Sequence, residues 1–276
     1  MSNPAPAHTA NTHNANGTAV ITGASAGLGK VYADRLAKRG YDLVLVARRA
    51  DRLDAIAAAL RAQYGVAVRT VVADLGARDD LERVAADIGS DASVTVLVNN
   101  AGTSTFAPLG DTTAEQLAAM NDVNVAALVR LSQVIVPRFK ARNRGTVINI
   151  GSVLGLFSFP GSAVYSGGKA YVNHFTRALQ DEVAGTGVVV QLVAPSATAT
   201  EIWDIAGVPV TNLQAGSVMT ADACVDAALA GLDQGETVTF PSLENPALFA
   251  AYEQARAALV AAFSSGTPAS RYGVGH

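Results

Sequence analysis

The amino-acid sequence predicts an α/β fold built on a doubly wound parallel sheet. Seven short apolar runs rich in β-branched residues alternate with longer segments of helical character, and a glycine-rich turn directly follows the first run. Strands that are apolar on both faces are typical of a parallel sheet buried between helices. A strand–helix alternation of this kind needs right-handed crossovers, and it places ligands beyond the carboxyl ends of the strands.

The expected elements follow in chain order. Strands are predicted at Ala19–Thr22, Leu43–Val46, Val66–Val72, Val94–Val98, Thr146–Ile150, Val188–Val193 and Thr237–Phe240. Helices are predicted between them, at Gly27–Arg39, Asp51–Tyr64, Arg78–Ile88, Thr113–Lys140, Ser162–Val183 and Ala221–Leu232, with a further Ala-rich helix at Pro246–Phe263. We therefore expect one domain over residues 18–264, a disordered extension over 1–17 and a flexible tail over 265–276.

Composition favours a compact globule. Half of the 276 residues are hydrophobic and only 16% are charged, which is enough apolar material for one large core. The net charge of −3 gives no attraction to nucleic acid or to an anionic membrane. No apolar run approaches the length of a membrane span, and the first residues lack the basic and apolar regions of a secretory signal. We expect a cytoplasmic enzyme.

Cysteine and histidine give little sign of metal or disulfide chemistry. The single cysteine, Cys224, excludes an internal disulfide and is expected in the core. His8, His13 and His276 lie near the chain ends, in segments without periodicity. We expect no metal site.

The glycine-rich turn runs Thr22-Gly-Ala-Ser-Ala-Gly-Leu-Gly29, between the first strand and the first helix. Gly23 permits the tight turn, Gly27 lets the backbone approach a pyrophosphate, and Gly29 lets the helix pack close to the sheet. Ser25 and Leu28 complete the loop, and the helix N-terminus offers free N–H groups to phosphates. A plain strand-to-helix loop is the alternative, but the context favours a Rossmann-type, single-domain dinucleotide-binding fold.

A second motif, Tyr165-Ser-Gly-Gly-Lys169, lies thirteen residues after Ser152. Tyr165 and Lys169 are expected one helical turn apart on the same face. A phenol has a pKa of about 10, and an ammonium about 4 Å away can bring it towards neutrality at an effective dielectric near 20. The pair therefore predicts an acid–base tyrosine tuned by a lysine.

Together these motifs resemble the short-chain dehydrogenase/reductase family over roughly Thr18 to Phe240. The resemblance rests on residues 22–29, on Asp74-Leu75 and Asn99-Asn100-Ala101-Gly102 after the third and fourth strands, on Asn124, and on Ser152, Tyr165 and Lys169. It implies a nicotinamide cofactor, with Asp74 and Leu75 at its adenine, Asn100 and Ala101 at its central region, and Thr200 near the carboxamide. One departure is Pro195-Ser196, where the family usually has Pro-Gly, and a serine there is expected to restrict the backbone of residues 197–200.

The end of the second strand suggests which cofactor is preferred. A site for NAD carries an acid about 20 residues past the glycine loop, to bind the ribose 2′-hydroxyl. Arg48 occupies this place, and a guanidinium favours the 2′-phosphate of NADP. Asp51 is the only acid nearby and is expected to cap the second helix. The alternative is that Arg48 and Arg49 are solvated surface charges. We expect NADP(H) as the cofactor, with NAD(H) less favoured.

The implied mechanism is reversible reduction of a ketone or aldehyde to an alcohol. Tyr165 is expected to donate the proton and Ser152 to hold the carbonyl oxygen. Lys169 is expected to lower the tyrosine pKa and to bind the nicotinamide ribose. Asn124 is expected to bind a water that passes protons from Lys169 to solvent. For Ser152 and Asn124 taken singly, ordinary backbone capping is the alternative.

The substrate is expected to be a small apolar or aromatic carbonyl compound or alcohol. Candidate walls of its pocket are residues 103–106, residues 153–159 and a lid at about residues 196–218, whose apolar side chains are Trp203, Ile205, Val208 and Val210. The lid has no lysine or arginine, which argues against highly anionic substrates. The alternative for Phe157 and Phe159 is that they serve in packing or in subunit contacts and do not line the pocket.

The helix at Thr113–Lys140 predicts self-association. Its apolar residues exceed what one side of a sheet requires, namely Leu117, Met120, Val125, Leu128, Leu131, Ile135 and Val136. With the helix at Ser162–Val183 it is expected to form the interface of a homodimer or homotetramer. Two alternative functions stay open: an NAD-dependent alcohol or hydroxysteroid-type dehydrogenase, and a non-catalytic nucleotide-sensing protein.

Overall fold

The computed structural model describes residues 16–208, 210–213, 216–263 and 266–274. The chain divides into two compact units, Met1–Pro241 and Ser242–His276. The first unit holds the sheet and the candidate site. The second holds helix α9 (Pro246–Ala262) and a short turn at Ser270–Tyr272. The expected N-terminal extension lies outside the described residues except for 16 and 17, and so do His8, His13 and His276.

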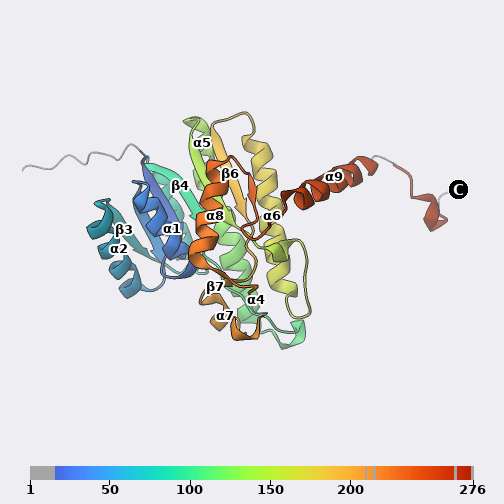
Figure 1. Ribbon diagram of the computed structural model, residues 1–276, viewed down its shortest axis with the longest axis horizontal. Helices are drawn as coiled ribbons and strands as arrows, with labels where there is room; N and C mark the ends of the chain where they lie inside the picture. The colour runs from blue at the N-terminus through green and yellow to red at the C-terminus, as the bar shows by residue number, and fades with distance from the viewer. Residues whose placement is uncertain (1–15, 209, 214–215, 264–265, 275–276) are drawn as a thin grey trace, which may run out of the picture. The chain divides into compact units, whose positions relative to one another are not determined.

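The central sheet of the first unit confirms the predicted fold class. Its strands are β1 (Thr18–Thr22), β2 (Asp42–Ala47), β3 (Val68–Val72), β4 (Val94–Asn99), β5 (Gly145–Ile150), β6 (Val188–Val193) and β9 (Val238–Thr239). Their order is β3-β2-β1-β4-β5-β6-β9 and every pair of neighbours is parallel (Figure 1). The chain reverses its winding direction between β1 and β4, where such sheets bind ligands.

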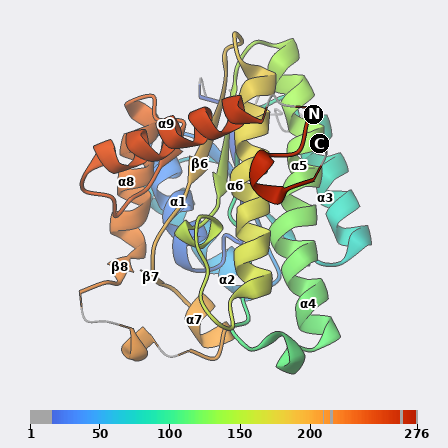
Figure 2. The same ribbon diagram turned by 90° about the vertical axis from the view of Figure 1, so that its right-hand side faces the viewer.

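Helices cover both faces of this sheet because each strand presents apolar side chains in both directions. On one face lie α1 (Gly27–Lys38), α2 (Ala50–Tyr64) and α8 (Ala221–Asp233), and on the other lie α3 (Arg78–Ser90), α5 (Ala127–Ala141) and α6 (Ala163–Val183) (Figures 1 and 2). In β1, Ala19 and Ile21 belong to the first core and Val20 to the second. Cys224 is buried in α8, as expected.

The single long helix predicted at Thr113–Lys140 is wrong in one respect. The structure has α4 (Ala114–Asn121), a π-helical turn (Asp122–Ala126) and then α5. A π turn inserts one residue into an otherwise continuous helix, so the 3.6-residue pattern does not reveal it. The surplus apolar surface expected here is also mostly absent, since the chain itself buries Met120, Leu128, Leu131, Ile135 and Val136.

The start of α2 corrects another expectation. The helix begins at Ala50, with Arg49 in the N-cap position and no side-chain cap. Asp51 therefore lies in the first turn, where its charge still favours the helix dipole, and does not cap the helix.

A buried polar cluster joins the middle of the sheet to two helices. Asn99 of β4 and Asn149 of β5 are register partners, and the Asn99 amide donates to Asn149 Oδ1 at 2.9 Å. The same amide donates to Ser132 Oγ of α5 at 3.1 Å, and Asn149 donates to Thr176 Oγ1 of α6 at 3.0 Å. The cluster thus fixes α5 and α6 against β4 and β5.

Within the described residues, no helix has the length and apolar character needed to span a membrane, and no group of three or more His, Cys, Asp or Glu side chains could hold a metal ion.

Candidate active site

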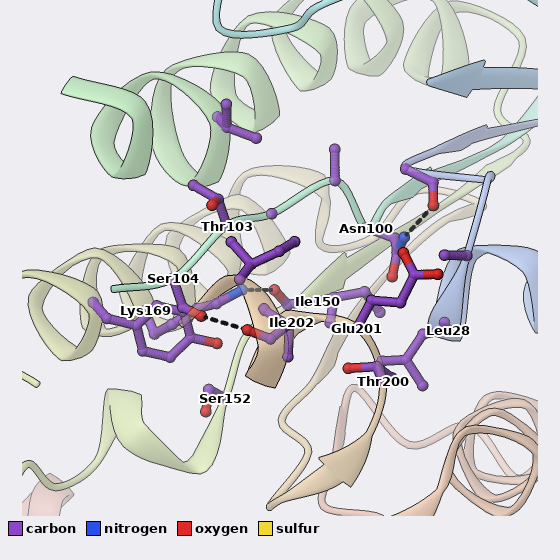
Figure 3. Close-up of a pocket in the computed structure, with 18 of the residues that line it drawn as sticks. Leu28, Asn100, Thr103, Ser104, Ile150, Ser152, Lys169, Thr200, Glu201 and Ile202 are labelled. Carbon is purple, nitrogen blue, oxygen red and sulfur yellow. Dashed lines mark hydrogen bonds between the residues drawn. The ribbon is translucent and has the colours of Figure 1, made fainter. Parts of the chain in front are cut away.

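A cleft of about 900 Å³ lies at the carboxyl ends of the central strands. Most of the predicted site residues line it: Gly23, Ser25, Gly27, Leu28, Arg48, Asp74, Leu75, Asn100, Ala101, Ser152, Tyr165, Lys169 and Thr200. Figure 3 shows how side chains from several elements converge there, with Leu28 and Thr200 on one side and Ser152 and Lys169 on the other. Gly29 and Asn124 are predicted site residues that do not line it.

The glycine loop leaves a bare backbone facing the cleft. Gly23 and Gly27 have positive φ angles of 66° and 51°. A Cβ on Gly23 would lie 2.9 Å from Ala101 Cα, and one on Gly27 would lie 3.1 Å from Thr200 Cγ2. A Cβ on Gly29 would lie 2.3 Å from the Gly23 carbonyl oxygen, so Gly29 is needed for the turn itself. This cradle at the start of α1 fits the pyrophosphate of a dinucleotide.

Asn100 fastens the glycine loop to the end of β4. Its side chain donates to the Thr22 carbonyl at 2.9 Å, and its backbone N–H donates to Thr22 Oγ1 at 2.9 Å. Ala101 N–H donates to the same hydroxyl at 3.0 Å. The β1 and β4 ends are therefore held together, and Thr22 is a supporting residue that the motif analysis did not single out.

The catalytic candidates come together as predicted. Ser152 follows β5, while Tyr165 and Lys169 lie one turn apart on α6. All three are buried, with 7%, 9% and 6% of each residue exposed. The Ser152 hydroxyl is close enough to the Tyr165 phenol to lower its pKa. Lys169 Nζ donates to the Ile150 carbonyl at 2.8 Å and lies 5.7 Å from the centre of the Tyr165 ring (Figure 3).

Burial is the main influence on the pKa values of Tyr165 and Lys169 when no cofactor is bound. It raises the pKa of Tyr165 to about 12, opposed by the nearby Ser152 hydroxyl. It lowers the pKa of Lys169 to about 8. The expected lowering of the tyrosine pKa by Lys169 is not seen, because the ammonium is directed to the Ile150 carbonyl. What this geometry provides is a protonated phenol beside a lysine that exchanges its proton near neutral pH.

Asn124 lies within the stretch predicted as one long helix. It lies in the π turn between α4 and α5 and is buried. Its side chain accepts from Thr103 N–H and donates to the Thr103 carbonyl, both at 2.8 Å. The side chain therefore clamps the loop after β4, and its part in proton transfer stays a prediction.

Sequence reasoning missed Asn173, which supports Ser152. The Asn173 amide donates to the Ser152 carbonyl at 3.1 Å, and the residue is buried on α6 one turn beyond Lys169. A Cβ on Gly151 or on Gly155 would lie 2.2 Å from an atom of its side chain. The signal was a polar residue four positions after Lys169 on the same helix face.

An aromatic wall surrounds the Tyr165 phenol. The Phe106 ring lies 5.4 Å from the Tyr165 ring in an edge-on arrangement. It also lies 5.3 Å from Phe159 and 5.9 Å from Trp203. Phe106, Phe159 and Trp203 all line the cleft, and so does the exposed Phe157. This part of the cleft suits an apolar or aromatic group.

The segment expected to be a lid contains strand β7 (Thr198–Ala199) and helix α7 (Ile202–Ile205). Strand β7 pairs in parallel with β8 (Met219–Thr220), which directly follows the segment. Residues 209, 214 and 215 of this segment lie outside the described residues, and so does the Val210 side chain. Ser196 has no positive φ, so the serine imposes none of the expected restriction. Thr200 consequently reaches the glycine loop beside Gly27.

Charged residues around the adenosine end of the cleft were only partly foreseen. Arg48 is exposed, and its Nη1 lies 3.9 Å from Asp74 Oδ2. Glu201 accepts from Arg49 at 2.8 Å and from Arg52 at 2.5 Å. Arg49 and Glu201 line the cleft, but they are 152 residues apart in the chain, so no local pattern points to their pairing.

The doubly wound sheet, the glycine cradle and the Ser152–Tyr165–Lys169 arrangement are those of a dinucleotide-linked oxidoreductase. The family model described as short chain dehydrogenase matches residues 17–206. The chain therefore belongs to the short-chain dehydrogenase/reductase family, as its motifs predicted.

Two solved structures are similar over nearly the whole chain. One is a short-chain dehydrogenase from Sphingobium yanoikuyae in complex with NADPH, with 42% identity and a TM-score of 0.89, covering 93% of this chain and 100% of that one. The other is the bulky-bulky ketone specific alcohol dehydrogenase from Comamonas testosteroni, with 35% identity and a TM-score of 0.86, covering 93% and 98%.

Curated relatives match over a shorter stretch. A very-long-chain 3-oxoacyl-CoA reductase from Anas platyrhynchos is 35% identical over 193 residues, or 68% of this chain. The human 17-beta-hydroxysteroid dehydrogenase type 3 is 34% identical over 188 residues, or 66% of this chain. The chain spans about three fifths of the length of these relatives, at 61% and 59%.

Proposed function

We propose that this protein is an NADP(H)-dependent oxidoreductase that reduces an apolar or aromatic ketone or aldehyde to the alcohol, and runs the reverse reaction. The observation that carries the proposal is the buried set of Ser152, Tyr165 and Lys169 beside an aromatic wall, in a cleft whose other end is a glycine cradle. A nicotinamide cofactor supplies or accepts the hydride when it is bound.

The chain's own residues handle the substrate oxygen and the proton. Ser152 donates a hydrogen bond to the carbonyl oxygen and holds it beside the phenol. Tyr165 transfers its proton to that oxygen during reduction and takes it back during oxidation. Lys169, buried and with a pKa of about 8, replaces the proton of the phenolate. The Phe106, Phe159 and Trp203 rings exclude water from the reacting oxygen.

Arg48 supports the preference for NADP(H). It directly follows β2, where an NAD site places an acid for the ribose 2′-hydroxyl. Its guanidinium is exposed at the cleft, and its contact with the Asp74 carboxylate, at 3.9 Å, is long enough for a phosphate to displace. The similar Sphingobium protein was solved in complex with NADPH, which points the same way. NAD(H) with an alcohol or hydroxysteroid-type substrate is the alternative.

The aromatic wall supports a bulky, uncharged substrate. The similar Comamonas protein is described as specific for bulky-bulky ketones. The curated relatives include reductases of very-long-chain 3-oxoacyl-CoA. Residues 196–218 contribute no lysine or arginine to meet the phosphates of a coenzyme A group, so we favour the free ketone.

The proposal includes a homodimer or homotetramer that uses the outer face of α6. The chain leaves Gly167, Ala170, Tyr171, His174 and Ala178 exposed along this helix. A Cβ on Gly167 would meet no atom within 4 Å, so packing inside the chain does not explain this glycine. A glycine in mid-helix costs roughly 1 kcal/mol relative to alanine, and close approach of a second copy would account for it.

A panel of ketones and aldehydes with NADPH or NADH tests the proposed function. Oxidation of the cofactor is followed by nicotinamide absorbance, and alcohol formation is confirmed by chromatography. We expect turnover of aryl and bulky aliphatic ketones with NADPH and much less with NADH. Equal rates with NADH would favour the dehydrogenase alternative. Tight binding of NADPH without turnover of any carbonyl compound would favour a nucleotide sensor.

A further inference from the structure

Three charged side chains bridge one side of the cleft. Glu201 immediately precedes α7, and its carboxylate accepts from Arg49 Nη1 at 2.8 Å and from Arg52 Nη1 at 2.5 Å. Arg49 follows β2, and Arg52 lies in the first turn of α2. The bridge therefore ties the α7 segment (residues 198–208) to the side of the sheet that faces the adenosine of a dinucleotide.

Arg49 has a second partner in the glycine loop. Its Nη2 donates to Ser25 Oγ at 3.0 Å, and both residues line the cleft with Arg48 and Glu201. The carboxylate of Glu201 thus pairs with two of the three arginines that follow β2, Arg49 and Arg52. Arg49 and Arg52 hold the pKa of the Glu201 carboxyl below its usual value, so the group is ionised near neutral pH.

We propose that Glu201 competes with the 2′-phosphate of NADP(H) for Arg49 and Arg52, so that binding of the phosphate releases the start of α7. The inference rests on the NADP(H) dependence proposed above. A phosphate monoester carries about −1.5 to −2 charges near pH 7, against −1 for a carboxylate. Guanidinium groups pair with phosphate through two parallel hydrogen bonds, and the same N–H groups cannot serve both anions. The phosphate also repels the ionised Glu201.

Other contacts of α7 confine the resulting movement. Ser104 Oγ donates to the Ile202 carbonyl at 3.2 Å, and Trp203 Nε1 donates to the Thr198 carbonyl at 2.8 Å (Figure 3 shows the Ser104–Ile202 contact). The Trp203 ring lies 5.9 Å from the Phe106 ring in the aromatic wall. Loss of the Glu201 bridge lets α7 shift about these points. Cofactor identity is thereby coupled to the shape of the substrate wall.

Trp203 reports this movement without any turnover. It is the only tryptophan of the chain and lies two residues after Glu201. The probes are adenosine 2′,5′-bisphosphate, which has the 2′-phosphate and no nicotinamide, and 5′-ADP, which lacks that phosphate. Calorimetry gives the two dissociation constants, while Trp203 emission and its quenching by acrylamide give the state of α7. Glu201→Gln removes the charge at nearly constant volume, and Asp204→Asn, an exposed carboxylate on the same helix, is the control.

Glu201→Gln is expected to bind the 2′,5′-bisphosphate roughly tenfold more tightly, as expected when one competing ion pair is removed, and 5′-ADP within about twofold of the parent. In the parent, the bisphosphate shifts Trp203 emission and increases quenching, whereas 5′-ADP does not. In Glu201→Gln the emission without nucleotide already resembles that of the bisphosphate-bound parent. Asp204→Asn behaves as the parent does.

Unchanged or weaker binding of the bisphosphate by Glu201→Gln would overturn the inference, because Glu201 would then orient Arg49 for the phosphate. If Trp203 emission and quenching do not change when the bisphosphate binds, the proposed release of α7 is wrong. In both cases the protein would still bind NADPH and reduce its substrate. These results can therefore be told apart from a failure of the proposed function. If the parent binds NADH as tightly as NADPH, the proposed cofactor preference fails and this inference fails with it.

Discussion

The Lys169 ammonium lies 5.7 Å from the centre of the Tyr165 ring and gives its hydrogen bond to the Ile150 carbonyl. Both groups are more than nine-tenths buried, so water stabilises neither charge. The pKa of the phenol is about 12 and that of the ammonium about 8, each displaced towards its neutral form. This inverts the simple picture of a lysine that lowers a tyrosine pKa, and it leads to the first two predictions.

Tyr165→Phe should lower turnover by about 10²- to 10⁴-fold, because it removes only the proton donor and keeps the ring in place. The change is measured as kcat on a ketone that the parent reduces. Affinity for NADPH and thermal stability should change little. Tyr252→Phe, at an exposed tyrosine on α9, is the control. Near-normal turnover of the Tyr165→Phe protein would refute the mechanism.

Lys169→Met should change how stability depends on pH. In the native protein the lysine releases its proton near pH 8, but in the unfolded chain it does so near 10.5. Between these values the unfolded state binds more protons, so the native state of the parent gains stability as pH rises. From pH 8 to pH 10 the unfolding free energy of the parent should gain about 2 kcal/mol relative to the variant.

Urea titrations of both proteins at pH 8, 9 and 10 measure that difference. Burial of Cys224 raises its thiol pKa to about 11, which lowers stability with rising pH in both proteins and cancels in the comparison. A parent and a variant with parallel pH profiles would show that Lys169 titrates normally.

Arg48→Asp should weaken binding of NADPH by on the order of 100-fold, because a charge-assisted contact with the 2′-phosphate is replaced by repulsion. Binding of NADH should be unchanged or tighter. Fluorescence titration with the two cofactors measures the effect. Arg144→Asp, the control, makes the same change of net charge at an exposed position directly before the central strand β5, at its amino end. A variant that keeps the parent's cofactor preference would remove Arg48 from the phosphate site.

Asn173→Ala should lower both stability and turnover. The unfolding free energy should fall by about 1–3 kcal/mol, because the buried Ser152 carbonyl loses its donor. Turnover should fall more than KM changes, since Ser152 loses its backbone anchor. Gln180→Ala is the control: this side chain of α6 donates to the Val190 and Thr237 carbonyls, far from Ser152, so it should cost stability alone. Equal effects of both variants on kcat would mean that Asn173 is only structural.

Ala178→Glu should dissociate the oligomer by placing a charge on the exposed face of α6. Light scattering at micromolar concentration should give an oligomer for the parent and a monomer for the variant. Ala58→Glu, exposed on α2, should leave the oligomer intact. A monomeric parent would dismiss the assembly proposal outright.

The sheet could be predicted because a buried parallel strand leaves a local signature, an apolar run such as Leu43–Val46 that admits few other structures. The positions of Tyr165 and Lys169 followed from helical spacing alone. The π turn around Asn124 could not be predicted, since one extra residue in a helix leaves no mark in the pattern. Nor could the Arg49–Glu201 bridge, which depends on how two distant loops fold over the cleft.

The Asn99–Asn149 pair also dictates which alignment of strands the folding chain accepts. A slip of one residue between β4 and β5 would put the two amides on opposite faces of the sheet, so one of them would lose its contact with Ser132 or Thr176 as well as its asparagine partner. Each amide left without a partner would cost about 1–3 kcal/mol, whereas a sheet of interchangeable valines would tolerate the slip. Because Thr176 is seven residues beyond Lys169 on α6, misaligned chains would be penalised before a catalytic centre could form.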